Sequence, residues 1–324
     1  MDHPGAFPKI VTLRVPRIPA WVKAIYLCAV IAVLGWAVVD STAQIQHWRH
    51  LATDSRAYLF MAAWAGMAFL LGAAWSLLLR WRFGVQLGIR EWLPIQALAW
   101  GGRYLPGKLG LLAGKFALLG RGVLDAKRLA YSVLWEQLAF VLSAAVAVAL
   151  FMGVPFAGTP EVLASHWEGV RVAVGLVGLG LFLALDTILR RIWPGARESG
   201  RALGAGKRFT LLALYLVPHL IVGAGTYPLL CALIPEAAPL GATGMIGLLA
   251  LANMAGILAI FAPAGMGVRE AVLGLGLIPF APLPSVLAFA AVLRLLTLMA
   301  DVLFFVLAGG VALLYRLRNP GSNI

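Results

Sequence analysis

Six continuous apolar runs, each close to the thickness of a bilayer, constrain this chain more than any other feature. A membrane-crossing helix needs about 20 apolar residues, and a transmembrane β-barrel would alternate polar and apolar positions instead. The chain is 62% hydrophobic and only 12% charged. We therefore expect an all-α polytopic membrane protein, with a single transmembrane domain over 1–324. The predicted spans are 20–39, 58–79, 129–151, 169–189, 209–234 and 285–314.

The basic residues gather in alternate connections between these runs. They lie before the first run, after the second, before the third, after the last and throughout the connector 190–208. The opposite loops hold only Arg49 and Arg56, beside several acidic residues. Because Lys and Arg stay on the cytoplasmic side, both termini are predicted to be cytoplasmic. The net charge of +13 is explained by this topology and by anionic lipid, without nucleic acid as a partner.

Two further apolar stretches, 91–119 and 241–279, are interrupted by Pro and Gly with basic residues in the break. Their arms are mostly shorter than the roughly 20 residues that a full crossing needs, so each is predicted to be a re-entrant helical hairpin. Paired, interrupted segments in the two halves of a membrane protein are typical of a transporter's binding site. The residues predicted to break the helices are Pro106, Gly107, Gly110, Pro263, Gly265 and Gly267.

The charge pattern makes the two hairpins enter from opposite faces of the membrane. Each half then consists of two spans, a broken hairpin and a span, which is an inverted-topology repeat with half-repeats at about 20–151 and 169–314. Aligning Pro106 with Pro263 also aligns Gly110 with Gly267. The alternative is ten full spans, in which each broken stretch crosses the membrane twice.

Ionisable side chains at bilayer depth are costly, so they are candidates for function. Because the hairpins are mostly cationic, they favour an anionic ligand, and Arg suits phosphate oxygens. The candidates for binding a lipid headgroup are Arg103, Lys108, Lys115, Arg269 and the amide of Asn253. The candidates for a gate or an ion pair are Glu136, Glu270, Arg294 and Asp301.

Several of these residues have simpler interpretations. Lys115 and Arg269 could extend to an interface through their long apolar stems. The repeat alignment predicts an ion pair between Glu136 and Arg294 across the two halves. For Asp301 the alternatives are a pair with Arg294 and the capping of a packed turn. Asp186 is close to a span end and is predicted to be interfacial.

Enzymatic signatures are missing from the sequence. It contains no HExxH, GxSxG or P-loop motif, so we expect neither an enzyme nor a nucleotide site. Its two cysteines, Cys28 and Cys231, both fall within predicted spans. We therefore expect no disulfide framework, no metal site and no cofactor.

Three motifs of the first half and three of the second carry a resemblance to a known family. The first half contains Arg103-Tyr-Leu-Pro-Gly-Lys-Leu-Gly110, Gly120-Arg-Gly-Val123 and Leu134-Trp-Glu136. The second contains Asn253, Pro263-Ala-Gly-Met-Gly-Val-Arg-Glu270 and Arg294. Together they resemble the lysylphosphatidylglycerol synthase transmembrane family over about 90–315, although Gln137 stands where an Arg commonly follows the Glu.

The resemblance implies a stand-alone flippase of the bacterial inner membrane, without the aminoacyl-transferase domain. Its substrate would be an anionic or amphiphilic lipid of the phospholipid or hopanoid class. Two alternatives remain: a translocase for undecaprenyl phosphate or a glycolipid carrier, and a non-transporting scaffold for a lipid-modifying enzyme. A homo-oligomer or an enzyme of lipid synthesis is the partner to expect besides the lipid itself.

Overall fold

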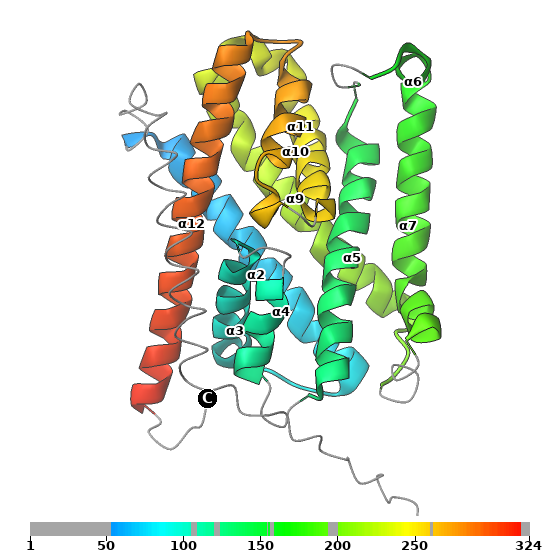
Figure 1. Ribbon diagram of the computed structural model, residues 1–324, viewed down its shortest axis with the longest axis vertical. Coiled ribbons are helices and arrows are strands. Elements are labelled where there is room, and N and C mark those ends of the chain that lie inside the picture. Colours follow the sequence, from blue (N-terminus) through cyan, green and yellow to red (C-terminus); the bar gives the residue numbers. More distant parts are fainter. Residues whose placement is uncertain are drawn as a thin grey trace, which may run out of the picture.

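The structure is a computed structural model that describes residues 53–104, 109–119, 124–153, 155, 159–193, 200–259 and 262–318. Within these ranges the chain forms helices and no strand (Figure 1). Six of the described helical segments are long and apolar enough to cross a membrane. The prediction of an all-α, multi-pass membrane protein is therefore confirmed.

Five of the predicted spans coincide with long helices. They are α2 (Ser55–Phe83), α5 (Ala126–Phe151), α7 (Trp167–Ile192), α9 (Ala205–Leu233) and α12 (Leu283–Arg318). The sixth predicted span, 20–39, falls outside the described residues. The remaining candidate span of the structure is Pro235–Leu258, which includes the first arm of the second broken stretch. The sequence had assigned that arm to a broken hairpin and not to a full span.

The two broken stretches form two helical hairpins. The first consists of α3 (Ile89–Gly101), the short 3-10 helix η2 (Gly102–Tyr104) and α4 (Leu109–Leu119). The second consists of α10 (Gly241–Leu258), η5 (Pro263–Gly265) and α11 (Val268–Leu277). In each hairpin the two arms pack against one another. A 3-10 turn, η4 (Pro235–Leu240), leads into α10, and the five-residue α6 (Glu161–Ser165) precedes α7.

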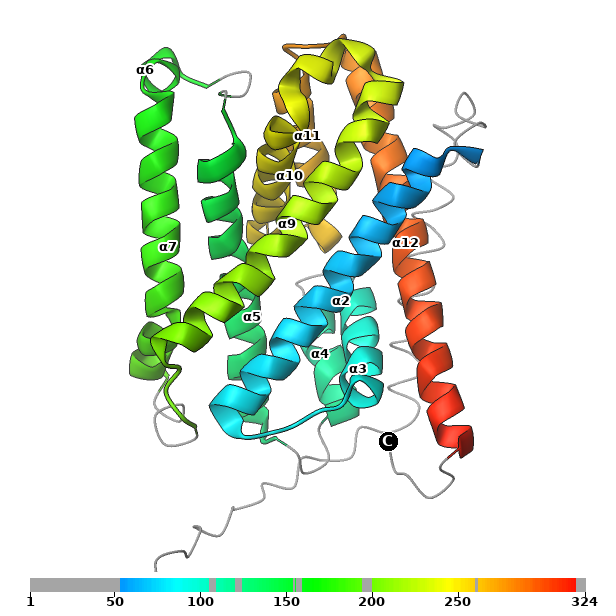
Figure 2. The same ribbon diagram turned by 180° about the vertical axis from the view of Figure 1, so that it is seen from behind.

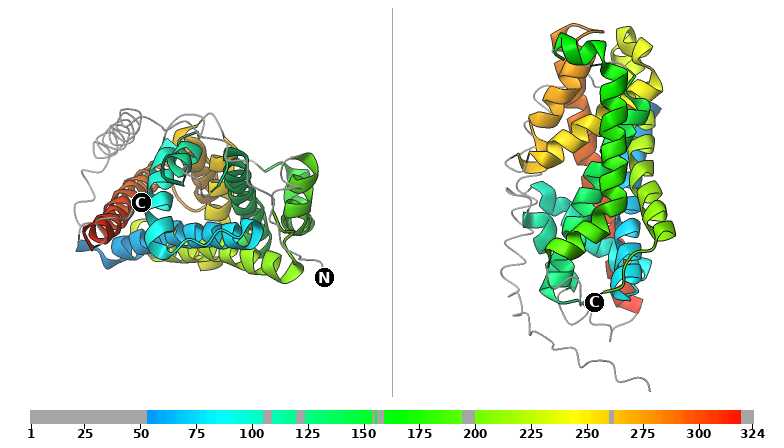
Figure 3. Two further views of the ribbon diagram at one scale, coloured as in Figure 1. Left: turned by 90° about the horizontal axis from the view of Figure 1, so that it is seen from below. Right: turned by 90° about the vertical axis from the view of Figure 1, so that its right-hand side faces the viewer.

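The two hairpins occupy opposite halves of the molecule along its long axis. Figure 1 shows α3 and α4 in the lower half and α10 and α11 in the upper half, and the right-hand view of Figure 3 shows the same separation. The tips point toward each other, and η2 contacts η5 near the middle. The breaks in the two apolar stretches therefore meet at the centre of the helical bundle.

Glycines allow the backbone to turn tightly at both tips. A Cβ atom on Gly110 would lie 2.1 Å from the carbonyl oxygen of Gly102, so α4 can approach η2 only with Gly there. In the second tip Gly265 and Gly267 have φ values of 73° and 80°, a region that L side chains rarely adopt. A Cβ on Gly265 would also lie 2.7 Å from the Cα of Gly256 in α10. Gly265 and Gly267 thus lie between α10 and α11, whereas Gly110 is the second residue of α4.

Two long helices support the hairpins from behind. α2 and α9 lie side by side and run diagonally across the molecule in Figure 2. The view along the long axis in Figure 3 shows them as one layer, with the hairpins in the other. α12 packs against α2, α3 and α11, whereas α5 packs against α7, α9 and α10. Both hairpin tips are thus enclosed by long helices from both halves of the chain.

Candidate functional site

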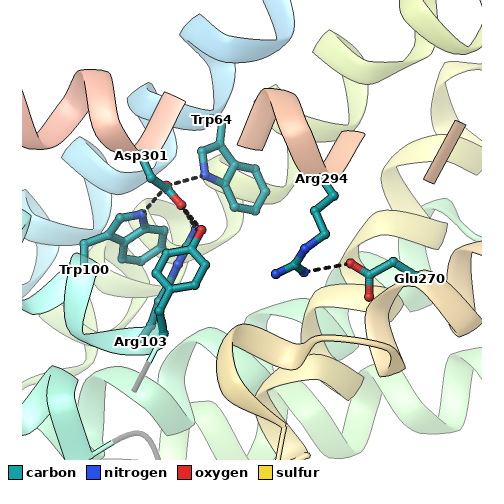
Figure 4. Close-up of polar contacts among 7 residues, drawn as sticks. Trp64, Trp100, Arg103, Glu270, Arg294 and Asp301 are labelled. Carbon is teal, nitrogen blue, oxygen red and sulfur yellow. Dashed lines mark hydrogen bonds and ion pairs between the residues drawn. The ribbon is translucent and has the colours of Figure 1, made fainter. Parts of the chain in front are cut away.

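Two opposite charges on one face of α12 connect this helix to both hairpin tips. Arg294 and Asp301 are seven residues apart, which places them about two turns apart on the same side of a helix. Asp301 interacts with the tip of the first hairpin, and Arg294 interacts with the second hairpin (Figure 4). The predicted pair of Arg294 with Asp301 is therefore wrong, because each has its own partner.

Asp301 is the centre of a buried hydrogen-bond network. Its Oδ1 accepts hydrogen bonds of 2.9 Å from the indole nitrogens of Trp64 in α2 and Trp100 in α3. Its Oδ2 accepts hydrogen bonds from Arg103 and from the hydroxyl of Tyr104, both in η2. Only 3% of the Asp301 side chain is exposed. One carboxylate thereby joins α2, the first hairpin and α12.

Aromatic rings surround the guanidinium of Arg103. Its Cζ atom lies 4.3 Å from the ring centroid of Trp100, 5.3 Å from Trp64 and 5.1 Å from Tyr104. A cation over an aromatic face is attracted by the negative potential of the ring. Arg103 therefore has both a carboxylate and three rings as partners, and its orientation is set by the protein itself.

The second hairpin contributes a carboxylate that has two functions. Glu270, in the first turn of α11, accepts a hydrogen bond of 2.8 Å from the backbone N–H of Gly267 and so caps the helix. Its other oxygen accepts a bond of 3.0 Å from Nη1 of Arg294. Glu270 therefore both caps the start of α11 and holds the contact between α12 and the second hairpin.

Arg269 differs from the other two arginines because it has no carboxylate partner among the described residues. Its guanidinium lies 4.5 Å from the ring centroid of Trp64, on which Arg103 also stacks. Its Nε atom is buried and has no hydrogen-bond partner in the described part of the chain. A buried guanidinium donor without an acceptor is unfavourable, so Arg269 is suited to receive an anion from outside.

The three arginines line one small hollow between the hairpin tips. The hollow, of about 20 Å³, is bounded by Arg103, Arg269, Arg294, Tyr104 and Glu270. Each arginine has one buried guanidinium nitrogen without a hydrogen-bond partner among the described residues: Nε in Arg103 and Arg269, and Nη2 in Arg294. The three arginines and the two carboxylates that pair with them carry a net charge of +1. This described cluster is therefore one negative charge short of neutrality.

A larger cavity of about 90 Å³ lies against the same tips. Arg103 and Arg269 line it, together with Asn253 of α10 and Glu136 of α5. A cavity needs at least about 10–15 Å³ of this volume to hold one water molecule, so there is room here for a few waters or a small polar group. The other lining side chains are mainly apolar: Trp64, Met67, Leu71, Trp100, Leu111, Phe140 and Ile257. The cavity thus joins a polar end to an apolar wall.

Glu136 forms an ion pair with Lys115 of α4 and not with Arg294. The predicted pair between Glu136 and Arg294 is wrong, and so is the extension of Lys115 to an interface, because its side chain is 0% exposed. The ammonium of Lys115 also lies 3.9 Å from the ring centroid of Trp75. Each charge compensates the other within the first half of the chain.

Replacing Glu136 with Gln should destabilise the protein more than the double replacement Lys115→Met with Glu136→Gln. Removing one partner of a buried pair costs about 3–5 kcal/mol, whereas replacing both with neutral groups is often close to neutral. Thermal unfolding in detergent would measure both variants. If the double variant unfolds at a lower temperature than Glu136→Gln alone, the two charges do not compensate each other.

The structure does not describe all the residues that the sequence selected. Pro106, Gly107 and Lys108 fall outside the described residues, and Lys108 is therefore untested as a headgroup ligand. Asp186, predicted to be interfacial from its place near a span end, is 1% exposed and lies 3.2 Å from Nε of Arg82. Arg82 comes from the end of α2 and is itself fully buried, so this ion pair joins two helices.

The aromatic side chains of the site were not among the candidates predicted from the sequence. Trp64, Trp75, Trp100 and Tyr104 all contact the buried charges, yet none was selected as a candidate. The position of the Trp residues in the sequence could have indicated this part of the site. Trp is usually concentrated at membrane interfaces, whereas these indoles occur within or beside apolar runs. An indole N–H inside a span needs an acceptor, and its presence there indicates a buried polar group.

Comparisons with known proteins identify no relative. No model of a known protein family matches the chain, and no curated protein matches it. The resemblance of the two hairpin motifs is therefore a hypothesis that these comparisons do not support, and the function must be argued from the geometry.

Proposed function

We propose that this chain is a flippase of the bacterial inner membrane that moves a lipid with an anionic headgroup between the leaflets. The observation that carries the proposal is the cluster of three arginines at the hairpin tips. With the two carboxylates that pair with it, this cluster is one negative charge short of neutrality, and each guanidinium has a buried nitrogen without a partner in the described part of the chain. A lipid phosphate would supply both the missing charge and the missing acceptors.

The chemistry of the arginines favours a phosphate oxygen over a neutral headgroup. Guanidinium groups are weakly hydrated and donate parallel hydrogen bonds that match phosphate geometry. At bilayer depth such contacts compete with little water, which strengthens them. Arg103 and Arg294 are already oriented by their carboxylates, so Arg269 is the group that gains most when an anion binds.

We further propose that the hairpins are re-entrant and that the two halves are inverted repeats. The ion pairs support this relation, because in each half the helix that follows the hairpin pairs with the hairpin's second arm. In the first half Glu136 of α5 pairs with Lys115 of α4, and in the second Arg294 of α12 pairs with Glu270 of α11. The corresponding helices carry opposite charges, but the pattern of contacts is the same.

The hairpin motifs would place the protein in the lysylphosphatidylglycerol synthase transmembrane family, as a stand-alone member that moves a phospholipid or a hopanoid-class lipid. The site geometry alone would serve equally for undecaprenyl phosphate. A scaffold for a lipid-modifying enzyme needs no buried cations that lack an acceptor, so the arginine cluster favours transport. Lipid that co-purifies with the protein, identified by native mass spectrometry, would separate the substrate classes.

Reconstitution into vesicles tests the proposal directly. The purified chain is expected to speed the transfer of a fluorescent phosphatidylglycerol between leaflets, and to leave the transfer of a fluorescent diacylglycerol at the rate of protein-free vesicles. The two probes share acyl chains and differ in the phosphate headgroup that the arginines would bind. Equal rates for phosphatidylglycerol with and without protein would contradict a flippase with this specificity.

Labelling of single cysteines tests the topology. In a background without the native cysteines, Lys127→Cys should react with an impermeant reagent only from the cytoplasmic side and Glu236→Cys only from the opposite side. Both positions are exposed, beside the bases of the two hairpins. Ala264→Cys, at the second tip, should not react from the cytoplasm. Cytoplasmic labelling of position 264 would favour ten full crossings over re-entrant hairpins.

A further inference from the structure

A second cluster of cations lies at the other end of the long helices, away from the hairpin tips. The end of α2 and the beginning of α9 meet there, at the lower left of Figure 2. Between them is an open hollow of about 690 Å³. No acidic residue lines it among the described residues, and its basic side chains are Arg80, Arg82, Arg201 and Lys207.

A buried network holds the connector against the end of α2 and so builds one side of this hollow. Arg82 is fully buried, and its Nη1 donates a hydrogen bond of 2.9 Å to the carbonyl oxygen of Arg201. In return the backbone N–H of Arg201 donates a bond of 2.8 Å to the carbonyl oxygen of Arg82. Asp186 of α7 balances the charge of Arg82 and accepts a bond of 3.1 Å from the N–H of Leu203.

Close packing supports the same arrangement. A Cβ atom on Gly200 would lie 2.4 Å from Nη1 of Arg82 and 2.5 Å from its carbonyl oxygen, so only Gly fits at this position. The described end of the connector, from Gly200 onward, is thereby held against α2, and Arg201 lines the same hollow as Arg80. A topology signal requires basic residues only somewhere in a cytoplasmic loop. Here a buried ion pair joins Arg82 of α2 to α7, and a reciprocal pair of hydrogen bonds joins Arg82 to Arg201. A topology signal alone does not require such contacts.

The charges in the hollow that face solvent are not compensated within the described part of the chain. Arg80, Arg201 and Lys207 are exposed, and none of them forms an ion pair with a described residue. Lys207 lies 5.9 Å from the ring centroid of Trp81. Repulsion among three neighbouring cations is unfavourable without an anion between them. The geometry is that of an anion site at the end of a membrane span.

We propose that this hollow binds a phosphate group, supplied by an anionic phospholipid of the adjacent leaflet. Trp81 is placed like an interfacial anchor at the end of the α2 span. Phe209, two residues after Lys207, is 54% exposed and provides an apolar surface next to the cations for the acyl chains. A free phosphate ion would use the cations but not this apolar surface. The site is independent of the one at the hairpin tips.

The test compares two double variants that remove the same charge from the same end of the molecule. Arg80→Gln with Lys207→Gln changes the hollow, and Lys127→Gln with Arg191→Gln changes exposed cations outside it. Both are made in an Arg269→Gln background, so that lipid bound at the hairpin tips contributes little to the measured binding. Native mass spectrometry then measures binding of phosphatidylglycerol to each protein in a neutral detergent, and thermal unfolding verifies that both are folded.

The hollow variant is expected to bind phosphatidylglycerol about 30-fold more weakly, which corresponds to about 1 kcal/mol for each of the two basic residues removed. The control variant should stay within about twofold of its parent. Equal affinity of the two double variants would overturn the proposal. A parallel titration with inorganic phosphate separates the sources: displacement of the lipid by millimolar phosphate would assign the site to the free ion.

This experiment also distinguishes the peripheral site from the proposed flippase activity. The hollow variant without the Arg269→Gln change should transfer phosphatidylglycerol across vesicles at close to the rate of the unmodified chain. Loss of lipid binding at the hollow with transfer retained supports two separate sites. If the unmodified chain transfers no lipid, the binding measurement still decides the inference about the hollow.

Discussion

Arg269→Gln is expected to slow the transfer of an anionic lipid by about tenfold or more, with little change in the stability of the protein. A hydrogen bond to a charged group contributes about 1.5–3 kcal/mol, and each 1.4 kcal/mol corresponds to a factor of about ten. Arg269 has no carboxylate partner among the described residues, so its loss leaves no acid unpaired. Transfer of fluorescent phosphatidylglycerol in vesicles measures the effect.

The matched control for this variant is Arg191→Gln. Arg191 is an exposed residue in the last turn of α7, and its replacement removes the same charge. An exposed charge of this kind contributes little to stability. Transfer rates that are the same for Arg269→Gln and Arg191→Gln would remove Arg269 from the binding site and would leave the scaffold hypothesis as the better explanation of the hairpins.

Asp301→Asn should have the largest effect on stability of any single replacement in the site. The carboxylate accepts hydrogen bonds from Trp64, Trp100, Arg103 and Tyr104, and only 3% of it is exposed. The amide of Asn removes the negative charge and turns one acceptor into a donor that faces the existing donors. Removing one partner of a buried ion pair costs about 3–5 kcal/mol, which should lower the folded yield markedly.

A double-mutant cycle with Arg103→Gln separates the ion pair from the rest of the network. The double variant should be more stable than the sum of the two single effects predicts, because neither charge is then left alone. Part of the loss in the free energy of unfolding should remain, because the indole N–H groups of Trp64 and Trp100 then face an amide, which is a poorer acceptor than a carboxylate. Strict additivity of the two effects on the free energy of unfolding would show that Asp301 and Arg103 act separately.

Local sequence patterns were sufficient to predict most of the long helices and the two interrupted stretches. The length and polarity of the apolar runs predicted α2, α5, α7, α9 and α12, because a helix that satisfies its own backbone hydrogen bonds is the simplest way to cross a bilayer. Pro and Gly predicted where the two remaining stretches break, and the positive φ values of Gly265 and Gly267 agree with that prediction. One candidate span, Pro235–Leu258, includes α10, which the sequence had assigned to a broken hairpin.

The partners of the charged residues could not be read from such patterns. The sequence selected six charged residues because charges in apolar runs are conspicuous, and in the structure all of them are buried or partly buried: Arg103, Glu136, Arg269, Glu270, Arg294 and Asp301. The pairing of Glu136 with Arg294 assumed that the equivalent residues of two repeats meet. Each residue pairs instead with its own hairpin, as Lys115 and Glu270 show.

The sequence by itself thus determined that this is a helical membrane protein with two broken, cationic hairpins, since these properties depend on neighbouring residues. Only the tertiary structure decided which charges are compensated. Asp301 meets Trp64, Trp100 and Arg103 across 237, 201 and 198 positions of the chain, distances at which composition and periodicity carry no information. The helix packing that brings these residues together leaves Arg269 without an acidic partner among the described residues, because both nearby carboxylates are used by other arginines.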